Sequence, residues 1–277
     1  MLKKIMQIDR RIIFILVALA VIIPTLLKVS FPITVSEPTR KLYDYIEDLP
    51  PGSTVLIAFD YGPSSMAELQ PMGMAFLRHC FQKKIRVIGM TLVTDGATLG
   101  YEIMQEAAKT TDAIDGEDYV YLGFRPGTIQ VMLGMGTTIN SIFESDYSES
   151  RKGKPLAEIP MMAEIKNYDQ IDLVLDLASS STTEAWIAYI NTRYNQKIAA
   201  GVTGVIVSQM YPYLQTDQLI GLMPGLLGAA EYETLIDTPA KATKRMSVQS
   251  FVHLLVFSLV ILGNVAFFIQ KRENENV

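Results

Sequence analysis

Two long apolar segments without charged residues lie near the two ends of the chain. The first runs from Ile12 to Leu27 after four basic residues, and the second runs from about Met246 to Ile269 and precedes Lys271-Arg272. A helix needs about 20 apolar residues to cross the hydrocarbon core of a bilayer. The second segment meets this length. The first is slightly short, but Lys28 can extend its side chain to the interface and Val29 continues the apolar character.

Each segment has a second interpretation. The basic residues and the apolar stretch near the N-terminus also fit a secretory signal peptide, but no small-residue exit site follows the stretch. The C-terminal segment also fits a buried core helix, although its length and its basic end favour a membrane span. We therefore expect transmembrane helices at 12–29 and 246–270, a basic tail at 1–11, an α/β domain at 30–245 and a polar tail at 271–277.

The predicted middle domain is acidic. The chain is 49% hydrophobic and 19% charged, with 24 basic and 29 acidic residues. Seven of the basic and three of the acidic residues lie in the tails and at Lys28, so residues 29–270 hold 17 basic and 26 acidic residues, a net charge of −9. An acidic domain repels phosphate backbones, so nucleic acid is not an expected partner. The expected partners are the lipid bilayer and either a second copy of the chain or another membrane protein.

Short apolar segments alternate with helix-length segments through the middle of the chain. The apolar segments are typical of strands buried on both faces of a sheet. The alternation predicts a mostly parallel sheet of about five strands, Rossmann-like or flavodoxin-like, with helices on both faces. The expected strands are 54–59, 85–93, 118–124, 171–177 and 202–208, with 198–200 as a candidate extension of the last.

The segment from Leu219 to Ile236 is apolar and rich in small residues. We expect a last core helix there, and Gly221, Gly225 and Ala229 would form a small-residue ridge at a spacing of four on it. The alternative is a surface for oligomerisation or for packing near the membrane. Two polar residues of the C-terminal span also favour such a packing surface, because polar side chains within a span usually face another helix. The candidate interaction residues are thus Gly221, Gly225, Ala229, His253 and Asn264.

Polar side chains follow each predicted strand. Ligands of parallel α/β sheets bind beyond the carboxyl ends of the strands, so these side chains would meet at one edge. The candidate ligand-binding residues are Ser64, Ser65, Thr94, Asp95, Arg125, Ser180, Ser181 and Thr182. Arg125 would be the cation aimed at an anionic group. The alternative interpretation is that the hydroxyl and carboxyl side chains only cap helices, with Ser181 and Glu184 as a capping box.

The sequence offers few groups for catalysis. The chain has only two histidines, and neither His79, in a predicted helix, nor His253, in a predicted span, can complete a Ser-His-Asp triad at the strand ends. Cys80 is the single cysteine and fits a small buried side chain. No nucleotide-binding motif follows a strand, and we expect no cofactor and no metal site. Asp60 and Asp95 are the one carboxylate pair that adjacent strand ends could bring together.

These features lead to three hypotheses of function. The first is a non-catalytic accessory or scaffold subunit of a membrane assembly that associates with itself. The second is a sensor or receptor that binds a small polar ligand at the strand ends, and the third is a hydrolase or transferase with Asp60 or Asp95 as its base. Basic residues favour the cytoplasmic side of a membrane, and the N-terminal tail has four of them. We therefore expect both tails in the cytoplasm and the domain outside.

Overall fold

The chain folds into an α/β domain and a pair of terminal helices. The structure, a computed structural model, describes residues 9–27, 32–148, 153–238 and 241–275. The domain comprises Ile33–Ala242, and the second unit comprises the chain before and after it. Most of the expected basic tail, residues 28–31, 149–152 and 239–240, and the last two residues lie outside the described residues.

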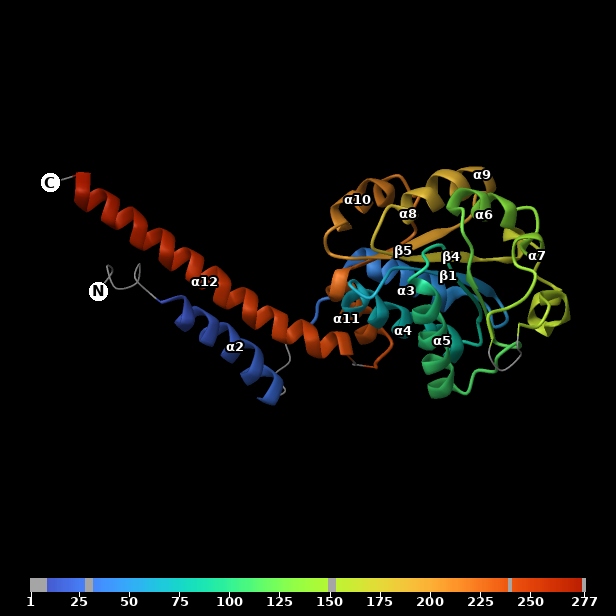
Figure 1. Cartoon of the computed structure of the whole chain (residues 1–277), viewed down its shortest axis with the longest axis horizontal. Helices are drawn as coiled ribbons and strands as arrows, with labels where there is room; N and C mark the ends of the chain where they lie inside the picture. The colour runs from blue at the N-terminus through green and yellow to red at the C-terminus, as the bar shows by residue number, and fades with distance from the viewer. Residues whose placement is uncertain (1–8, 28–31, 149–152, 239–240, 276–277) are drawn as a thin grey trace. The chain divides into compact units, whose positions relative to one another are not determined.

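Six parallel strands form the sheet of the domain (Figure 1). They are β1 (Thr54–Asp60), β2 (Arg86–Thr91), β3 (Tyr119–Phe124), β4 (Leu173–Ala178), β5 (Ile198–Val202) and β6 (Leu222–Pro224). Their order is β3-β2-β1-β4-β5-β6. This is the doubly wound Rossmann order, and it decides between the two topologies that the sequence left open. The order reverses between β1 and β4, which are neighbours in the sheet.

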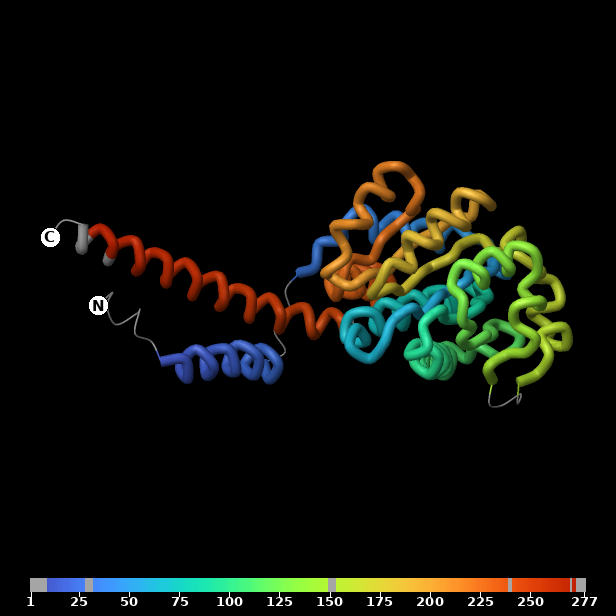
Figure 2. Tube along the Cα trace, turned by 45° about the horizontal axis from the view of Figure 1, so that its top comes forward, coloured from blue at the N-terminus to red at the C-terminus, as the bar shows by residue number. Residues whose placement is uncertain are grey.

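Helices cover both faces of this sheet. One layer contains α3 (Glu37–Asp48), α4 (Met66–Gln82), α5 (Gly96–Thr111) and α11 (Gly225–Leu235). Figures 1 and 2 both show α11 beside α4, two helices far apart in the sequence. The other layer contains α6 (Thr128–Met135), α7 (Ile139–Ile142), α8 (Thr182–Ala185), the π-helical turn η4 (Trp186–Asn191), α9 (Thr192–Tyr194) and α10 (Val207–Gln215). Three 3-10 turns, η1 (Leu156–Glu158), η2 (Pro160–Ala163) and η3 (Tyr168–Gln170), lead into β4.

The strands form where the sequence has short apolar segments because both faces of the sheet are covered. Every residue of β1 and of β4 is buried. On one face Ala58 belongs to the same apolar cluster as Trp186. On the other face the side chains of Phe59 and Leu177 reach Gly73 of α4, where a Cβ atom would lie 3.4 and 3.0 Å from them. The core is therefore two apolar layers separated by the sheet.

Two expected elements differ from the structure. The fifth strand ends at Val202, and most of the expected 202–208 segment becomes a turn and the start of α10. The expected helix at 219–236 is also wrong in its first part, because residues 222–224 pair with β5 as the short strand β6. Pro224 supplies no N–H and stands directly before α11, whose first residue, Gly225, has a positive φ of 53°. A three-residue strand is too short to show a period of two in the sequence.

The terminal unit holds two long apolar helices, α2 (Arg10–Leu27) and α12 (Lys241–Glu275). By length and composition, Arg10–Leu27 and Lys241–Ile269 could each cross a bilayer. Only 6% of the most apolar window of each helix is buried. The interpretation of the C-terminal segment as the core helix of a soluble domain is therefore wrong.

Candidate functional site at the strand ends

Two aspartate side chains lie on one face of the sheet where the strand order reverses. Asp60 is the last residue of β1, and Asp176 lies in β4 opposite Ala58, two residues before Ala178, which pairs with Asp60. Residues two apart on a strand point to the same side, so both carboxyl groups face the helical layer that contains Trp186. Neither residue has any exposed surface. The adjacent strands thus place two buried carboxyl groups side by side.

Each carboxyl group accepts hydrogen bonds on one oxygen. Asp60 Oδ1 accepts from the backbone N–H of Leu92 at 2.6 Å and from the hydroxyl of Thr91 at 3.2 Å. Asp176 Oδ2 accepts from the hydroxyls of Thr182 at 3.0 Å and Thr183 at 2.7 Å. The end of β2 and the first turn of α8 therefore hold the pair from opposite sides.

The other oxygen of each group has no N–H or O–H donor. Asp60 Oδ2 and Asp176 Oδ1 are buried without a partner among the described residues, as is the indole Nε1 of Trp186. The hydroxyl of Tyr61 and one oxygen of Glu184, at the same strand ends, are in the same state. Buried polar atoms in folded proteins almost always have a partner, and a shared proton or a ligand supplies one. Their concentration at one place marks it as a candidate site.

The surroundings favour one proton on the carboxyl pair. Burial raises the pKa of Asp60 to about 6, although the neighbouring groups of Leu92, Asp176, Thr91 and Trp186 lower it. Burial and the charge of Asp60 raise the pKa of Asp176 well above its usual range. Ionising two adjacent carboxyl groups costs much free energy in a medium of low dielectric constant. Burial and mutual repulsion therefore raise the pKa values of the pair and favour its protonated form.

This pair differs from the expected pair of Asp60 and Asp95. Asp95 comes four residues after the end of β2, is exposed, and stands at the start of α5. It lies near Gly62, where a Cβ atom would be 3.1 Å from Asp95 Oδ2. A metal site is not found either: the described residues contain no group of three or more His, Cys, Asp or Glu side chains that could hold an ion.

The expected ligand-binding residues surround the pair unevenly. Thr182 bonds directly to Asp176. Ser64, Thr94, Asp95, Ser180 and Ser181 are exposed, and Ser65 is half-buried. Arg125 is half-buried with its guanidinium 5.7 Å from the centre of the Phe143 ring, and it follows β3, two strands away from β1. It is therefore remote from the acid pair.

The alternative interpretation of these residues as helix caps is wrong at three of the positions. Ser65, Asp95 and Ser181 stand at the starts of α4, α5 and α8, and none of them makes a side-chain hydrogen bond to the helix. The expected capping box of Ser181 and Glu184 is thus absent.

The expected interaction residues divide between the two units. Gly221, Gly225 and Ala229 are buried within the domain. A Cβ atom on Gly221 would lie 2.7 Å from Leu42 Cβ, so this glycine lets α3 cover the outer edge of β6. His253 and Asn264 lie exposed on α12, where the Asn264 side chain donates to the carbonyl of Val260 at 2.9 Å. The small-residue ridge is therefore internal packing.

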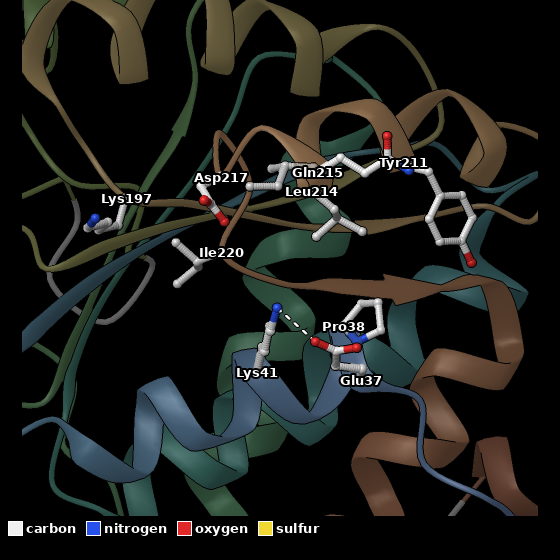
Figure 3. Close-up of a pocket in the computed structure, with 10 residues that line it drawn as sticks. Glu37, Pro38, Lys41, Lys197, Tyr211, Leu214, Gln215, Asp217 and Ile220 are labelled. Carbon is white, nitrogen blue, oxygen red and sulfur yellow. Dashed lines mark ion pairs between the residues drawn. The ribbon is translucent and has the colours of Figure 1, made fainter.

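A groove of about 780 Å³ lies on another part of the domain, between α3 and α10 (Figure 3). Lys197 and Ile220, which precede β5 and β6, line it at the amino end of the sheet. Lys41 forms an ion pair with Glu37 at 2.9 Å in this groove. The ion pair is exposed on both sides, and the groove has none of the buried unpartnered atoms of the strand ends.

Comparisons with known proteins give little beyond the fold. No family model matches the chain, and no curated protein sequence matches it. A solved structure described as the trehalose-6-phosphate synthase OtsA is similar, with 9% identity and a TM-score of 0.33 over 86% of this chain. The match covers 46% of that protein, so the chain spans about half of its length. The comparison assigns no substrate and no reaction to this chain.

The expectation of a non-catalytic accessory or scaffold subunit is corrected at this point. The grounds for the correction lie in this chain's own residues, because Asp60 and Asp176 form a buried pair of carboxyl groups with raised pKa values. The sequence did not single out Asp176, Thr183 or Trp186. A single aspartate within the apolar strand 173–178 was the available signal, since a buried acid needs a partner.

Proposed function

We propose that this chain is a membrane-attached enzyme in which Asp60 and Asp176 exchange protons with a small polar substrate. The observation that carries the proposal is that each carboxyl group is fixed by donors on one oxygen and unpartnered on the other, where β1 and β4 diverge. Ligands of doubly wound sheets bind at this switch point. Paired carboxyl groups with separated pKa values can act as acid and base in one reaction.

The hydrogen bonds assign a role to each group. Asp60 accepts from Leu92 and Thr91, which stabilises its carboxylate and suits it to act as the base. Burial and the charge of Asp60 raise the pKa of Asp176 well above its usual range, which suits Asp176 to the role of acid. A substrate hydroxyl would give its proton to Asp60 as its oxygen forms a bond to the reacting atom, and Asp176 would give its proton to the group whose bond to that atom breaks. Thr182 and Thr183 position Asp176 and are not proposed to react.

The charges of the site favour a neutral or cationic substrate. Asp60, Asp95 and Glu184 are the acidic groups at the ends of β1, β2 and β4, and Arg125 is two strands away over Phe143. The hydroxyls of Ser64, Ser180 and Ser181 are exposed around the same edge. Hydroxyl groups bind other hydroxyl groups well, since each donates and accepts. We therefore propose a neutral, hydroxyl-bearing substrate class.

Thermal unfolding with a panel of neutral polyols and sugars tests this proposal, with inorganic phosphate as the anionic comparison. A bound ligand raises the Tm of the folded state. We expect a polyol or sugar to raise the Tm of the wild type and of Arg125→Ala, and to have no effect on Asp60→Asn. Stabilisation by phosphate alone, or a polyol effect that survives in Asp60→Asn, would refute the proposed substrate class.

We also propose a two-pass topology with both tails in the cytoplasm and the domain outside. The support is the length and exposure of the two apolar helices and the four basic residues that precede α2 or begin it. Cysteines placed in the tail at Lys271 and in the domain at Asp169 distinguish the two orientations. A membrane-impermeant thiol reagent added to intact cells should label Asp169→Cys and spare Lys271→Cys, and the reverse pattern would contradict the topology.

A helix partner in the membrane is a further proposal for α12. His253 and Asn264 are exposed on this helix, and the neighbouring Gly263 has open space where a Cβ atom would be. These features allow a second helix to approach closely, from this chain or from another membrane protein. Crosslinking of Gly263→Cys in native membranes should give a dimer or a defined adduct, whereas a chain that stays monomeric would argue against it.

A further inference from the structure

An exposed apolar tip lies at the same edge of the sheet as the carboxyl pair. Its residues are Met66 in the first turn of α4, Val205 after β5 and Leu227 in the first turn of α11, which are 37%, 85% and 39% exposed. Val205 is the most exposed of the large hydrophobic side chains in the described chain, those of the apolar helices included. Exposing an apolar side chain to water is unfavourable in free energy. Exposed apolar patches often mark a binding surface.

The three segments that carry these side chains meet at Gly204. The N–H of Gly204, the residue before Val205, donates to Glu68 Oε2 of α4 at 2.8 Å. A Cβ atom on Gly225, two residues before Leu227, would lie 3.3 Å from the Gly204 backbone. The turn before α10 and the first turns of α4 and α11 therefore meet at Gly204. We call Met66, Val205 and Leu227 the apolar tip.

The tip is close to the carboxyl pair through the ends of the strands. The N–H of Thr203 donates to the carbonyl of Ala178, and the N–H of Ser179 donates to the carbonyl of Asp60. These bonds connect the end of β5 to β4 and the end of β4 to β1. Val205 follows Thr203 by two residues. Whatever surface the tip contacts is therefore near the proposed reaction centre.

The same helix that carries Leu227 also holds the chain where it enters and leaves the domain. Glu231 Oε2 of α11 accepts from Ser36 and Thr39 of the entering chain, both at 2.6 Å. Glu233 Oε1 accepts from the backbone N–H of Ala242 in α12 at 3.0 Å. Four and six residues along a helix correspond to about 6 and 9 Å. Leu227 thus lies about 6 Å along α11 from Glu231 and about 9 Å from Glu233, the two residues that bind the entering and leaving chain.

The attachment points are short distances from the apolar helices in the sequence. Ile33, the start of the domain, is six positions after Leu27, the end of α2, which is a reach of about 20 Å at most. Ala242 belongs to the helix that contains the second candidate span. If those helices lie in a bilayer, the lipid surface is within reach of the tip. The acidic domain gives no electrostatic attraction to anionic lipid, so an apolar contact is the one available.

We propose that the apolar tip contacts the lipid bilayer surface and holds the carboxyl edge of the sheet against it. The proposal rests on the membrane attachment in the proposed function, and it is independent of the chemistry at Asp60 and Asp176. It deepens that function by stating where the substrate is met, which is at the membrane surface. Val205 is the principal contact residue, with Met66 and Leu227 beside it.

Fluorescence of the full chain in lipid nanodiscs tests this contact. A cysteine at Val205→Cys is labelled with an environment-sensitive dye, and Lys197→Cys, at the other end of the same strand, is the matched control. Cys80 is fully buried, so it does not compete for the label. Phe257→Cys, exposed on α12, reports whether the helix is in the bilayer.

We expect the label at 205 to emit at shorter wavelength than the label at 197 and to lose most of its fluorescence in lipid that carries nitroxide groups. The label at 197 should be unaffected. If 257 is quenched and 205 is not, the contact is refuted while membrane attachment stands. If 257 is not quenched, the membrane attachment and the contact both fail. The acid–base proposal for Asp60 and Asp176 is untouched by either result.

Discussion

The carboxyl groups of Asp60 and Asp176 are each bound by protein donors on one oxygen and unpartnered on the other. They come from neighbouring strands, face the same side of the sheet and have no exposed surface. A single proton between them supplies a donor for one group and leaves one negative charge in the pair. Such an arrangement lowers the stability of the fold at high pH, and it is the basis of the acid and base roles that we propose.

The pair should make the stability of the domain depend on pH. Because the pKa of Asp60 is raised to about 6, the folded state binds more protons than the unfolded state between about pH 4 and pH 6. Stability contributed by protonated Asp60 is therefore present below pH 4 and is lost as the pH rises to 6. The loss is about 3 kcal/mol at most. Urea unfolding of Asp60→Asn should lack this fall, whereas the exposed Asp95→Asn should retain it.

The hydroxyl of Thr183 should stabilise the domain through Asp176. It donates to Oδ2 at 2.7 Å and is fully buried. Thr183→Val keeps the shape of the side chain and removes the donor, so we expect a loss of about 1–2 kcal/mol in the free energy of unfolding. Thr110→Val, which removes an exposed hydroxyl bonded to the carbonyl of Ala107, is the control. Equal losses of unfolding free energy in the two variants would show that the hydrogen bond from Thr183 to Asp176 does not stabilise the domain.

The close approach of α5 to the strand ends requires a glycine at position 96. A Cβ atom there would contact the carbonyl of Phe59 and the hydroxyl of Thr91, the same hydroxyl that donates to Asp60. Gly96→Ala should lower the free energy of unfolding by about 1–3 kcal/mol because the helix has to move. In Gly204→Ala the nearest atom would be 3.6 Å away, so we expect little change. A Gly96→Ala variant as stable as the wild type would contradict this packing.

A buried histidine should add a second, opposite pH dependence. His79 lies between Tyr232, at 2.8 Å from Nδ1, and Glu47, at 2.9 Å from Nε2. Burial lowers the pKa of His79, against the raising effect of Glu47 and with the lowering effect of Lys83. The unfolded state then binds the extra proton below about pH 6.5, so stability falls as the pH drops through that value.

Thermal unfolding of His79→Gln between pH 7 and pH 5 measures this effect. The variant should be less stable than the wild type at neutral pH and should lose less stability on acidification. His253→Gln, which changes the other histidine of the chain, is the matched comparison. A decline in His79→Gln as steep as that of the wild type would assign the pH dependence to other groups.

The sequence predicts the central strands well and the edge of the sheet poorly. β1 to β4 lie within two residues of the expected segments because their apolar residues are buried on both faces. β6 has three residues, and its pairing with β5 depends on α3 covering Gly221, a contact between distant segments. No local sequence pattern encodes this contact between α3 and Gly221, so the sequence of residues 219–236 predicted one continuous helix.

The sequence and the proposed site point to the same edge of the sheet but differ in the second carboxylate. Residues that follow the strands are visible in the sequence, which led to Asp95. Asp176 lies inside its strand, and its relation to Asp60 depends on which strand lies beside β1. The sequence left the strand order open between two topologies. Thr182 was found because it follows β4, and Trp186 was missed because an aromatic residue on a helix is typical of a core.

Infrared spectroscopy of the full chain at pH 7 tests the proton on the Asp60–Asp176 pair most directly. A buried carboxylic acid has a carbonyl stretch separate from the bands of carboxylates. We predict that the wild type has this band and that Asp176→Asn lacks it, while Asp95→Asn retains it. A wild-type spectrum without the band, or a band that persists in Asp176→Asn, would contradict the proposal that this pair holds a proton and acts as acid and base.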